Sequence, residues 1–451
     1  MASHLTQKTR RASYYVSVAA FLLSLTLLLL TVVDIRRGFL FSGYVKVGAP
    51  STLLNLDPRQ LMLLLAGSLG IWLSYKYIKK LESSFKAGGF NLKSVTTFTA
   101  VAIGVLLVID LFTYRGVPAS RFLAAGKMSI GSGPFGLGRA LSVDSFPVWL
   151  QPVGDGVNYL LVVWHATTLG MLLGSLFLVA GAGLVMKLHG NSFVTHLTGS
   201  AVALTQPFCS CCAAPIGSAL YRKGASIGPV LAFTVSAPML NITGLILAGA
   251  LLPPEFALLR IAGGIIVGVF LTYGVSLVAA RWLTHEGPEA TVNSKPVDWL
   301  SRALNAYGRL FQFEKLFSQT SLDSPSTLIS NWLSTTWRLA RVMVPVLLIG
   351  AVASAYVVKL MPPTGNNLPG VIVAAFFGTL LMVPTWTEIP LAAGLINNGM
   401  TGIAAAALIT LPAVSIPCLS IIAGSIQNVK ITLLLGASVM AAGIVAGLIF
   451  L

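Results

Sequence analysis

Charged residues are scarce in this sequence. Only 9% of its 451 residues are Asp, Glu, Lys or Arg, whereas an ordinary soluble domain carries about 25%. A soluble chain with so little charge could not cover its surface with polar groups, so a cytosolic or secreted globular protein is excluded. The hydrophobic content of 55% also excludes an intrinsically disordered chain, which needs low hydrophobicity and high charge.

Cysteine and acidic residues are also few. The chain has four cysteines, and three of them cluster at Cys209, Cys211 and Cys212, which does not suit a disulfide framework. It has 13 acidic residues and 29 Lys and Arg residues, which gives a net charge of +16. In a soluble protein this excess would indicate nucleic-acid binding. Here the basic residues flank apolar runs, so we expect contacts with anionic lipid and no nucleic-acid partner.

Long apolar runs fill most of the chain. A crossing takes roughly 20 residues, and every backbone amide in lipid must be bonded within its own segment. We therefore predict an all-α, polytopic transmembrane helix bundle of about eleven segments. The first run has no small-residue cleavage site after it, so we interpret it as an uncleaved helix with a cytoplasmic N-terminus. The runs cover 14–33, 60–75, 94–109, 156–186, 196–220, 227–252, 261–280, 342–358, 371–395, 402–426 and 431–451.

Two polar stretches divide the chain. Residues 114–155 are rich in Gly and Pro; they contain a formal G-x-G-x-x-G string, but no strand precedes it, so we expect a loop and no dinucleotide site. Residues 282–331 carry apolar side chains at helical spacing, which predicts an amphipathic interfacial helix, with a solvated linker helix as the alternative. The predicted organisation is three N-terminal helices in 1–113, the loop in 114–155, a first repeat in 156–281, the linker in 282–331 and a second repeat in 332–451.

The last two-thirds of the chain look like an internal repeat. Pro215, Gly224 and Pro238 have counterparts 175, 175 and 174 residues later. Paired Gly/Pro-interrupted segments in two halves are the best sequence indication of a transporter binding site. The basic 282–331 linker is cytoplasmic under the positive-inside rule only if one broken segment per half is re-entrant, which predicts two inverted repeats. The prolines expected to break helices are Pro207, Pro215, Pro238, Pro384, Pro390 and Pro412.

The most informative motif is Gln206-Pro-Phe-Cys-Ser-Cys-Cys-Ala-Ala-Pro215. Its two prolines free backbone carbonyls inside an apolar run, and such backbone is tolerated at membrane depth only where it is buried or lines a cavity. Thiol sulfur prefers soft metals and metalloids. We therefore predict that Cys209, Cys211 and Cys212 bind substrate and act as metal(loid) ligands, with Ser210 beside them. The alternative is that the cysteines are small apolar fillers.

Glu388 is the only charged residue between Lys359 and Lys430. A carboxylate in hydrocarbon costs about 2.5–3.5 kcal/mol on insertion scales, so an intramembrane acid indicates function. The repeat offset aligns Glu388 with the cysteine motif of the first half, and we predict that both approach one midplane substrate site. There Glu388 would couple protons or pair with a cationic substrate, and any cationic partner must come from another helix or be the substrate. A structural hydrogen bond to a broken helix is the alternative.

Other polar residues at these breaks are candidates for the same site. We include Asn241, Thr385 and Thr387 as substrate-binding candidates, with capping of freed backbone groups as the alternative for each. His165 lies inside the 156–186 run and is a second proton-coupling candidate, with a helix–helix hydrogen bond as its alternative. Cys418, directly after a proline, is a candidate fourth sulfur.

The string Pro-Phe-Cys-Ser-Cys-x-x-x-Pro at 207–215 resembles the signature of the YraQ/ArsP-like permease family. The ends of the two halves, Ser236-Ala-Pro238 and Leu411-Pro412-Ala413, resemble it as well, and so does Glu388-Ile-Pro390. The resemblance covers about 156–451. It implies an inner (plasma) membrane permease, in a family of which some members export trivalent organoarsenicals or other thiophilic metal(loid)s. This chain departs from the family in its Cys-Cys pair at 211–212.

These features predict a secondary transporter and not an enzyme. No G-x-x-x-x-G-K-[ST] string occurs, so we expect no ATP hydrolysis, and no cofactor is expected. The expected cargo is a thiophilic metal(loid) or an organoarsenical-type small molecule, exported with or without proton coupling, and the expected surroundings are the lipid bilayer. Assembly into a homo-oligomer is left open. The alternatives are a membrane thiol oxidoreductase, a permease for a small anion or sulfur compound on the same scaffold, and a channel.

Overall fold

The computed structural model describes residues 2–37, 56–85, 92–125, 141–181, 188–190, 192–204, 209–285, 323–362, 364–383, 386–426 and 428–451. Within these residues the chain is helical and contains no strand, in agreement with the all-α prediction. Three of the predicted site residues and most of the predicted linker lie outside the described residues, namely Pro207, Pro384, Thr385 and 286–322.

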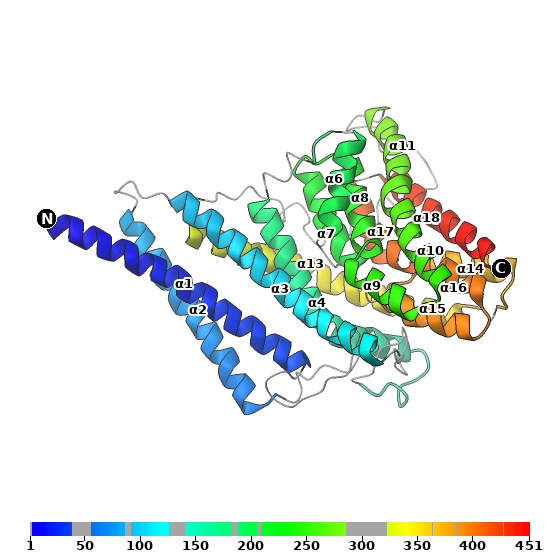
Figure 1. Cartoon of the computed structure of the whole chain (residues 1–451), viewed down its shortest axis with the longest axis horizontal. Coiled ribbons are helices and arrows are strands. Elements are labelled where there is room, and N and C mark those ends of the chain that lie inside the picture. The colour runs from blue at the N-terminus through cyan, green and yellow to red at the C-terminus, as the bar shows by residue number, and fades with distance from the viewer. Residues whose placement is uncertain are drawn as a thin grey trace. The chain divides into compact units, whose positions relative to one another are not determined.

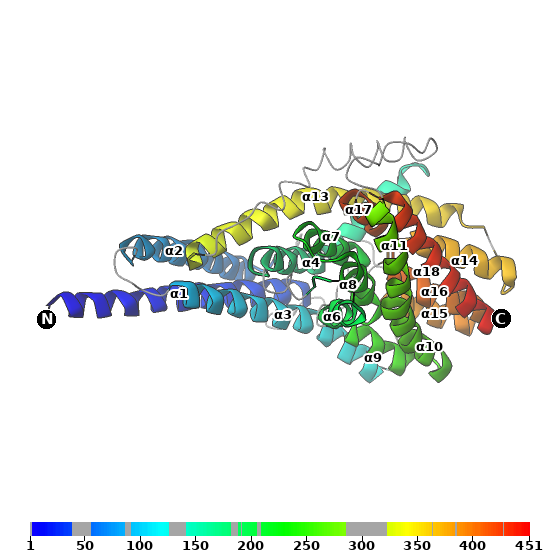
Figure 2. The same ribbon diagram turned by 90° about the horizontal axis from the view of Figure 1, so that it is seen from above.

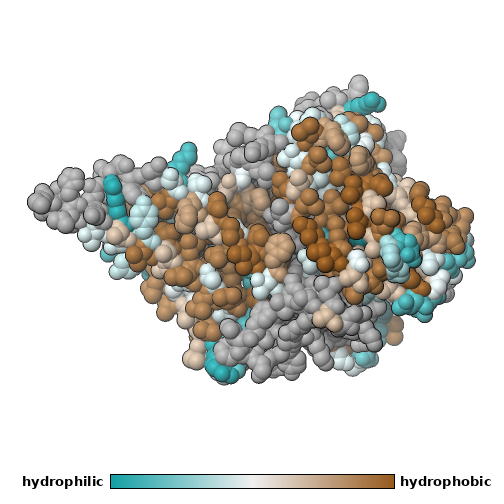
Figure 3. All heavy atoms as spheres, viewed as in Figure 1, coloured by the Kyte–Doolittle hydropathy of each residue, from teal (hydrophilic) through white to brown (hydrophobic). Residues whose placement is uncertain are grey.

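Nine helices of the described part are long and apolar enough to cross a membrane, so the chain is a multi-pass membrane protein. Two of the eleven predicted runs, 196–220 and 371–395, are not among these nine helices, and each is divided between two short helices. The runs at 227–252 and 402–426 are divided as well, at 240–241 and 414–415. Interrupted runs thus fall in both predicted repeats, and re-entry of any of them stays a prediction. Figure 3 shows that apolar residues cover much of the described surface in this view, as expected for a protein that faces lipid.

The predicted 114–155 loop is shorter than expected. Helix α3 (Leu92–Ala125) continues past the end of the apolar run, and α4 (Gln151–Ala180) begins before the next run. An apolar run marks only the part of a helix that contacts lipid. The helix itself can continue into polar residues at both ends, so the loop between two helices is shorter than the gap between two apolar runs.

One compact unit consists of Met1–Pro118, His165–Gly181 and Gln319–Trp337. In it, α1 (Ala2–Arg37) packs along α2 (Pro58–Phe85), as Figure 1 shows. Buried acids hold this unit together. Glu82 on α2 accepts hydrogen bonds from the Tyr14 hydroxyl of α1 at 3.0 Å and from the Ser326 amide at 3.0 Å. Since Ser326 is the second residue of α13 (Pro325–Leu360), the Glu82 carboxylate satisfies a free amide at that helix N-terminus.

The second compact unit consists of Ala119–Trp164, Ala182–Ser318 and Arg338–Leu451. Its centre is formed by α8 and α16: every residue of α8 is buried, and so is all of α16 except its first residue. Helices α6 and α7 pack on α8, while α14 and α15 pack on α16, and α16 runs beside α18 (Figure 2). The helices are α6 (Phe193–Leu204), α7 (Ser210–Arg222), α8 (Ile227–Met239), α9 (Ile242–Leu251), α10 (Pro254–Ile265), the π-helix η3 (Ile266–Leu271), α11 (Thr272–His285), α14 (Leu368–Leu380), α15 (Glu388–Asn397), α16 (Thr401–Ala413), α17 (Ile416–Ile426) and α18 (Val429–Ile449).

Two of the prolines expected to break helices do not break them. Pro215 lies inside α7, and Pro390 is the third residue of α15. A proline in the first turn of a helix costs no hydrogen bond because the amide there would be unpaired, which accounts for Pro390. Pro238 and Pro412 are the next-to-last residues of α8 and α16, so each directly precedes an interruption between two helices.

The two predicted repeats contain the same turn. Gly224 after α7 and Gly399 after α15 have φ angles of +101° and +72°. At both turns the next residue's amide bonds back to the helix, from Ala225 to the carbonyl of residue 220 and from Met400 to that of residue 395. Only glycine adopts this backbone at little cost, which makes it the usual residue at such helix ends. The matching turns support a duplication, while the inverted orientation of the halves stays a prediction.

Candidate functional site

Three thiols lie together at the N-terminus of α7. Cys209 precedes the helix with extended backbone (φ −76°, ψ 164°), and Cys211 and Cys212 belong to the first turn. The Cys209 Sγ lies 2.8 Å from the Cys211 Sγ and 3.2 Å from the Cys212 Sγ. All three sulfur atoms lie within 4.8 Å of one another, with Cys211 and Cys212 buried and Cys209 partly exposed. This cluster can hold one soft ion or metalloid through as many as three sulfur atoms.

Glu388 occupies the matching position at the N-terminus of α15. The chain reaches it through Trp386, a buried residue with a φ of +80°. Left-handed backbone in a non-glycine residue costs of order 1–3 kcal/mol, so it persists only where the surrounding packing enforces it. The indole contributes to that packing, because it belongs to a core cluster that includes Leu247 of α9 and Leu408 of α16. The start of α15, and with it Glu388, is therefore held by the interior of the unit.

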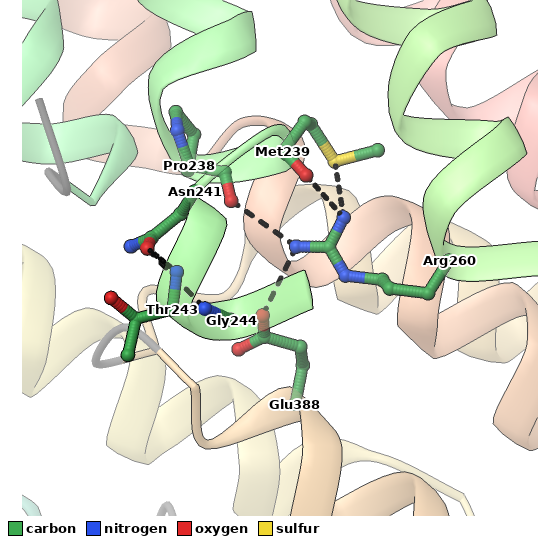
Figure 4. Close-up of polar contacts among 7 residues, drawn as sticks. All are labelled: Pro238, Met239, Asn241, Thr243, Gly244, Arg260 and Glu388. Carbon is green, nitrogen blue, oxygen red and sulfur yellow. Dashed lines mark hydrogen bonds and ion pairs between the residues drawn. The ribbon is translucent and has the colours of Figure 1, made fainter. Parts of the chain in front are cut away.

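Glu388 pairs with a buried guanidinium. The Arg260 Nη2 lies 3.2 Å from the Glu388 Oε1 and also donates to the Pro238 carbonyl at 3.1 Å (Figure 4). The Arg260 Nη1 donates to the Met239 carbonyl at 2.8 Å. The two charged side chains are only 1% and 2% exposed. The sequence predicted that a cationic partner of Glu388 would come from another helix or be the substrate, and in the structure Arg260 of α10 is such a partner.

Arg260 was not identified from the sequence as a charge inside a membrane helix, because the predicted apolar run began one residue later, at 261. The helix in fact begins at Pro254, so the guanidinium lies inside it and not at its edge. A signal was present in the sequence, since the Pro253-Pro254 pair is typical of a helix start and places Arg260 well after that start.

A small cavity lies between the two helix N-termini. Its volume is about 10 Å³, which is room for one water molecule. It therefore brings together three predicted substrate-binding residues from the two halves, Cys209, Ser210 and Glu388. Within the described part of the chain the Glu388 Oε2 has no hydrogen-bond partner. The lining residues are Cys209, Ser210, Pro238, Val383, Glu388, Leu411 and Pro412.

Three further described candidates of this unit are not among the residues that line the cavity, namely Asn241, Thr387 and Cys418. Asn241 caps α9, because its Oδ1 accepts from the amides of Thr243 at 3.1 Å and Gly244 at 3.3 Å (Figure 4). Thr387 precedes α15, and among the described residues its side chain makes no capping hydrogen bond. Cys418 is buried in α17, which packs on α7. For Asn241 the observed contacts correspond to the capping alternative.

His165 belongs to the other compact unit. Its Nε2 lies 3.2 Å from the Asp110 Oδ2, and both side chains are buried. The ring of Tyr114 lies 4.2 Å from the imidazole, centroid to centroid. Asp110 was missed for the same reason as Arg260, since the predicted run ended at 109 while α3 continues to Ala125. The observed contact is a bond between two helices, and an Asp–His pair in a membrane is also typical of proton relays.

Interrupted helices that meet at a cavity with an ionisable residue, within a bundle of membrane-crossing helices, are typical of the binding sites of membrane transporters. The comparison with known proteins agrees: the ArsP_1 family, described as a predicted permease, matches residues 157–451. The chain belongs to this family, as its cysteine motif predicted, and it is a transporter and not an enzyme.

Two relatives extend this comparison. The UPF0718 protein YraQ of Escherichia coli (strain K12) is 29% identical over 361 residues, which are 78% of this chain and 92% of that protein. The UPF0718 protein MJ0584 of Methanocaldococcus jannaschii is 22% identical over 330 residues, 62% of this chain and 90% of that protein. No solved structure matches the chain.

Proposed function

We propose that this protein is an inner (plasma) membrane permease that exports a trivalent organoarsenical or another thiophilic metal(loid) in exchange for protons. The observation that carries the proposal is the cluster of three thiols, all within 4.8 Å of one another, whose Cys209 lines the cavity. Thiol sulfur binds soft metals and metalloids. The thiols lie at a helix interruption, and non-helical backbone at membrane depth is tolerated where it is buried in protein or lines a cavity.

The chemistry of capture is a ligand exchange. A trivalent arsenic hydroxide exchanges each As–OH bond for an As–S bond, and the thiol proton leaves with the hydroxide as water. An organoarsenical with two hydroxides engages two thiols and arsenite engages three, so neither step changes the charge of the site. The reverse reaction with water releases the cargo. The described cavity, of about 10 Å³, is smaller than such a cargo, so we expect the two helix ends to separate when cargo is loaded.

The charges around the cavity support a neutral cargo. The Glu388–Arg260 pair is already compensated internally, so a free metal cation would add an unbalanced charge to a buried site, which is costly. Proton exchange is assigned to Glu388, with His165 as the second candidate.

A second cargo class, a small anion or sulfur oxyanion, has one observation in its favour. Ser210 and Glu388 are the first residues of α7 and α15, and both line the cavity, so two helix N-termini meet there. Helix N-termini present free amides and a positive dipole end to an anion. Accumulation of arsenicals, antimonite, copper, zinc and sulfur oxyanions in a strain that lacks the gene separates the two classes.

The thiol hypothesis is tested by replacing Cys209, Cys211 and Cys212 with Ser, singly and together. We expect each variant to lose uptake of trivalent methylarsenite in inverted vesicles while remaining folded, because Ser keeps the volume but is a poor ligand for soft elements. Cys418→Ser tests in the same assay whether the candidate fourth sulfur, buried in α17, also binds the cargo. A triple variant that transports like the parent would show that the motif matters only for its backbone.

The mode of transport is tested in the same vesicles. Accelerated exchange against preloaded cargo, or counterflow, is expected for a carrier and not for a channel, because a carrier returns loaded faster than empty. Uptake that shows no counterflow and does not saturate would favour the channel alternative.

A further inference from the structure

Arg260 makes every one of its described contacts at helix ends. Its guanidinium reaches from α10 to the Pro238 and Met239 carbonyls, which are the last two of α8, and to Glu388, the first residue of α15 (Figure 4). The C-terminal end of a helix carries partial negative charge on its free carbonyls. The guanidinium is therefore compensated by one full charge and one helix end, and it fixes the end of α8 to the start of α15.

The surroundings of Glu388 supply no other cation among the described residues that pack on it. Helices α9 and α16, which contact α15, contain no titratable residue, and Glu388 is the only one in α15 itself. On α10 the other charged residue is Glu255, which is exposed in the first turn. Across the cavity the facing titratable group is the Cys209 thiol. Arg260 is therefore the cationic partner of Glu388 among the described residues that pack on it.

We infer that Arg260 is a positioning residue of the transport site: it holds Glu388 ionised through Oε1 and leaves Oε2 free to accept a hydrogen bond. The inference rests on the proposed function only in taking this cavity as the transport site. The geometry that carries it is a charged pair at 3.2 Å, both members at most 2% exposed, with one carboxylate oxygen bonded and the other without a hydrogen-bond partner in the described structure.

A consequence follows for coupling. A proton that binds Glu388 removes the charge that compensates Arg260, and an uncompensated charge in a buried site is strongly unfavourable. Proton uptake at Glu388 therefore requires the guanidinium to move, and because the guanidinium also holds the end of α8, that movement is transmitted to the interruption between α8 and α9. The pair thus links the protonation of Glu388 to the backbone that borders the cavity.

The test is infrared difference spectroscopy of the purified protein in lipid at neutral pH, which distinguishes a carboxylate from a protonated carboxyl group and requires no substrate. The difference between parent and Glu388→Gln isolates Glu388. We expect this difference to show loss of a carboxylate band and no protonated carboxyl band. In Arg260→Gln we expect a protonated band, absent from the double variant Arg260→Gln/Glu388→Gln. Arg260→Lys keeps the charge and is expected to restore the carboxylate.

A protonated Glu388 in the parent protein would overturn the inference, and so would an unchanged carboxylate in Arg260→Gln. If Arg260→Gln does not fold, the comparison of the parent with Glu388→Gln still decides the question. The proposed cargo does not enter this experiment: a protein that fails to carry arsenicals can still show an ionised Glu388, and one that carries them can show a protonated Glu388. The pH profile of uptake gives a second measurement, with Arg260→Lys expected to follow the parent and Arg260→Gln to lose its dependence on pH.

Discussion

At the scale of single residues, buried acidic side chains of this transporter are bonded to polar or basic partners on other helices. Glu388 is bonded to Arg260, Asp110 to His165, and Glu82 to the hydroxyl of Tyr14. Removing one member of a buried ion pair costs about 3–5 kcal/mol, because the other charge stays behind without compensation. Substitutions that keep the shape and hydrogen bonding of these groups are therefore the informative ones.

Glu388→Gln is expected to abolish transport driven by a pH gradient while sparing substrate binding, and to lower the stability of the protein because the buried Arg260 guanidinium loses its compensating charge. The amide keeps the shape and still accepts a hydrogen bond from Arg260, but it cannot exchange a proton or release the guanidinium by titration. The measurement is uptake into inverted vesicles with and without an imposed pH gradient, together with equilibrium binding of methylarsenite.

Glu255→Gln is the matched control for this experiment, because Glu255 is an exposed acid in the first turn of α10 and makes no contact with the cavity lining. If Glu388→Gln retained gradient-driven uptake, the carboxylate would be structural. His165 would then be the next residue to replace.

At the scale of helices, close packing depends on particular glycines. Gly199 of α6 lies directly against α8: a Cβ at this position would lie 2.3 Å from the Pro229 carbonyl oxygen and 2.7 Å from its Cα. Both atoms belong to the backbone and cannot move without shifting α8, which is buried along its whole length. The approach of α6 to α8 is thus possible only with a hydrogen at this position.

Gly199→Ala is expected to destabilise the protein by about 1–3 kcal/mol, the usual cost of overpacking an interior. Thermal unfolding in detergent, followed by circular dichroism, measures the effect. Gly424→Ala in α17 is the matched control, since an added Cβ there meets no described atom within 4 Å. Equal melting temperatures for the two variants would mean that α6 is free to shift.

Whether a proline interrupts a helix in this protein depends on its surroundings as well as on the sequence. Pro215 was expected to break a helix, yet α7 continues through it to Arg222. Pro238 and Pro412, which were also expected to break helices, directly precede the interruptions at Leu240–Asn241 and Val414–Ser415. A proline weakens a helix by removing one amide donor and by crowding the carbonyl four residues earlier, so packing decides whether the helix ends there. At the end of α8 the guanidinium of Arg260 donates to the Pro238 and Met239 carbonyls, which the helix end leaves free.

At the scale of the whole molecule, the number of crossings sets the orientation of the two halves. The nine long helices of the described part leave the runs at 196–220 and 371–395 as divided segments, one per predicted repeat. If both are re-entrant, each half makes an odd number of crossings, the halves are inverted and the basic 282–331 linker is cytoplasmic.

This topology predicts that a single cysteine introduced at Asn293 is not labelled by a membrane-impermeant thiol reagent in whole cells and is labelled in inverted vesicles. A cysteine-free background, with the native cysteines changed to Ser, removes the signal of the motif. Labelling from outside intact cells would contradict both the re-entrant segments and the inversion of the halves.

The sequence by itself determined the class of protein, the helical fold, the family and several residues at the cavity. These are properties of neighbouring residues: a run of apolar side chains predicts a membrane helix, and the motif around Cys209 predicts the family. The sequence also predicted that the cysteine motif and Glu388 would approach one site, because the offset between the two predicted repeats aligns them.

Only the tertiary structure decided how the charges are paired and how large the cavity is. Arg260 and Glu388 are 128 residues apart and His165 and Asp110 are 55 apart, and no spacing in the sequence joins either pair. Arg260 and Asp110 stood at the edges of apolar runs, where hydropathy cannot tell a charge at the membrane surface from one buried against another helix. That distinction depends on packing, because a buried charge is stable only where another element of the fold supplies its partner.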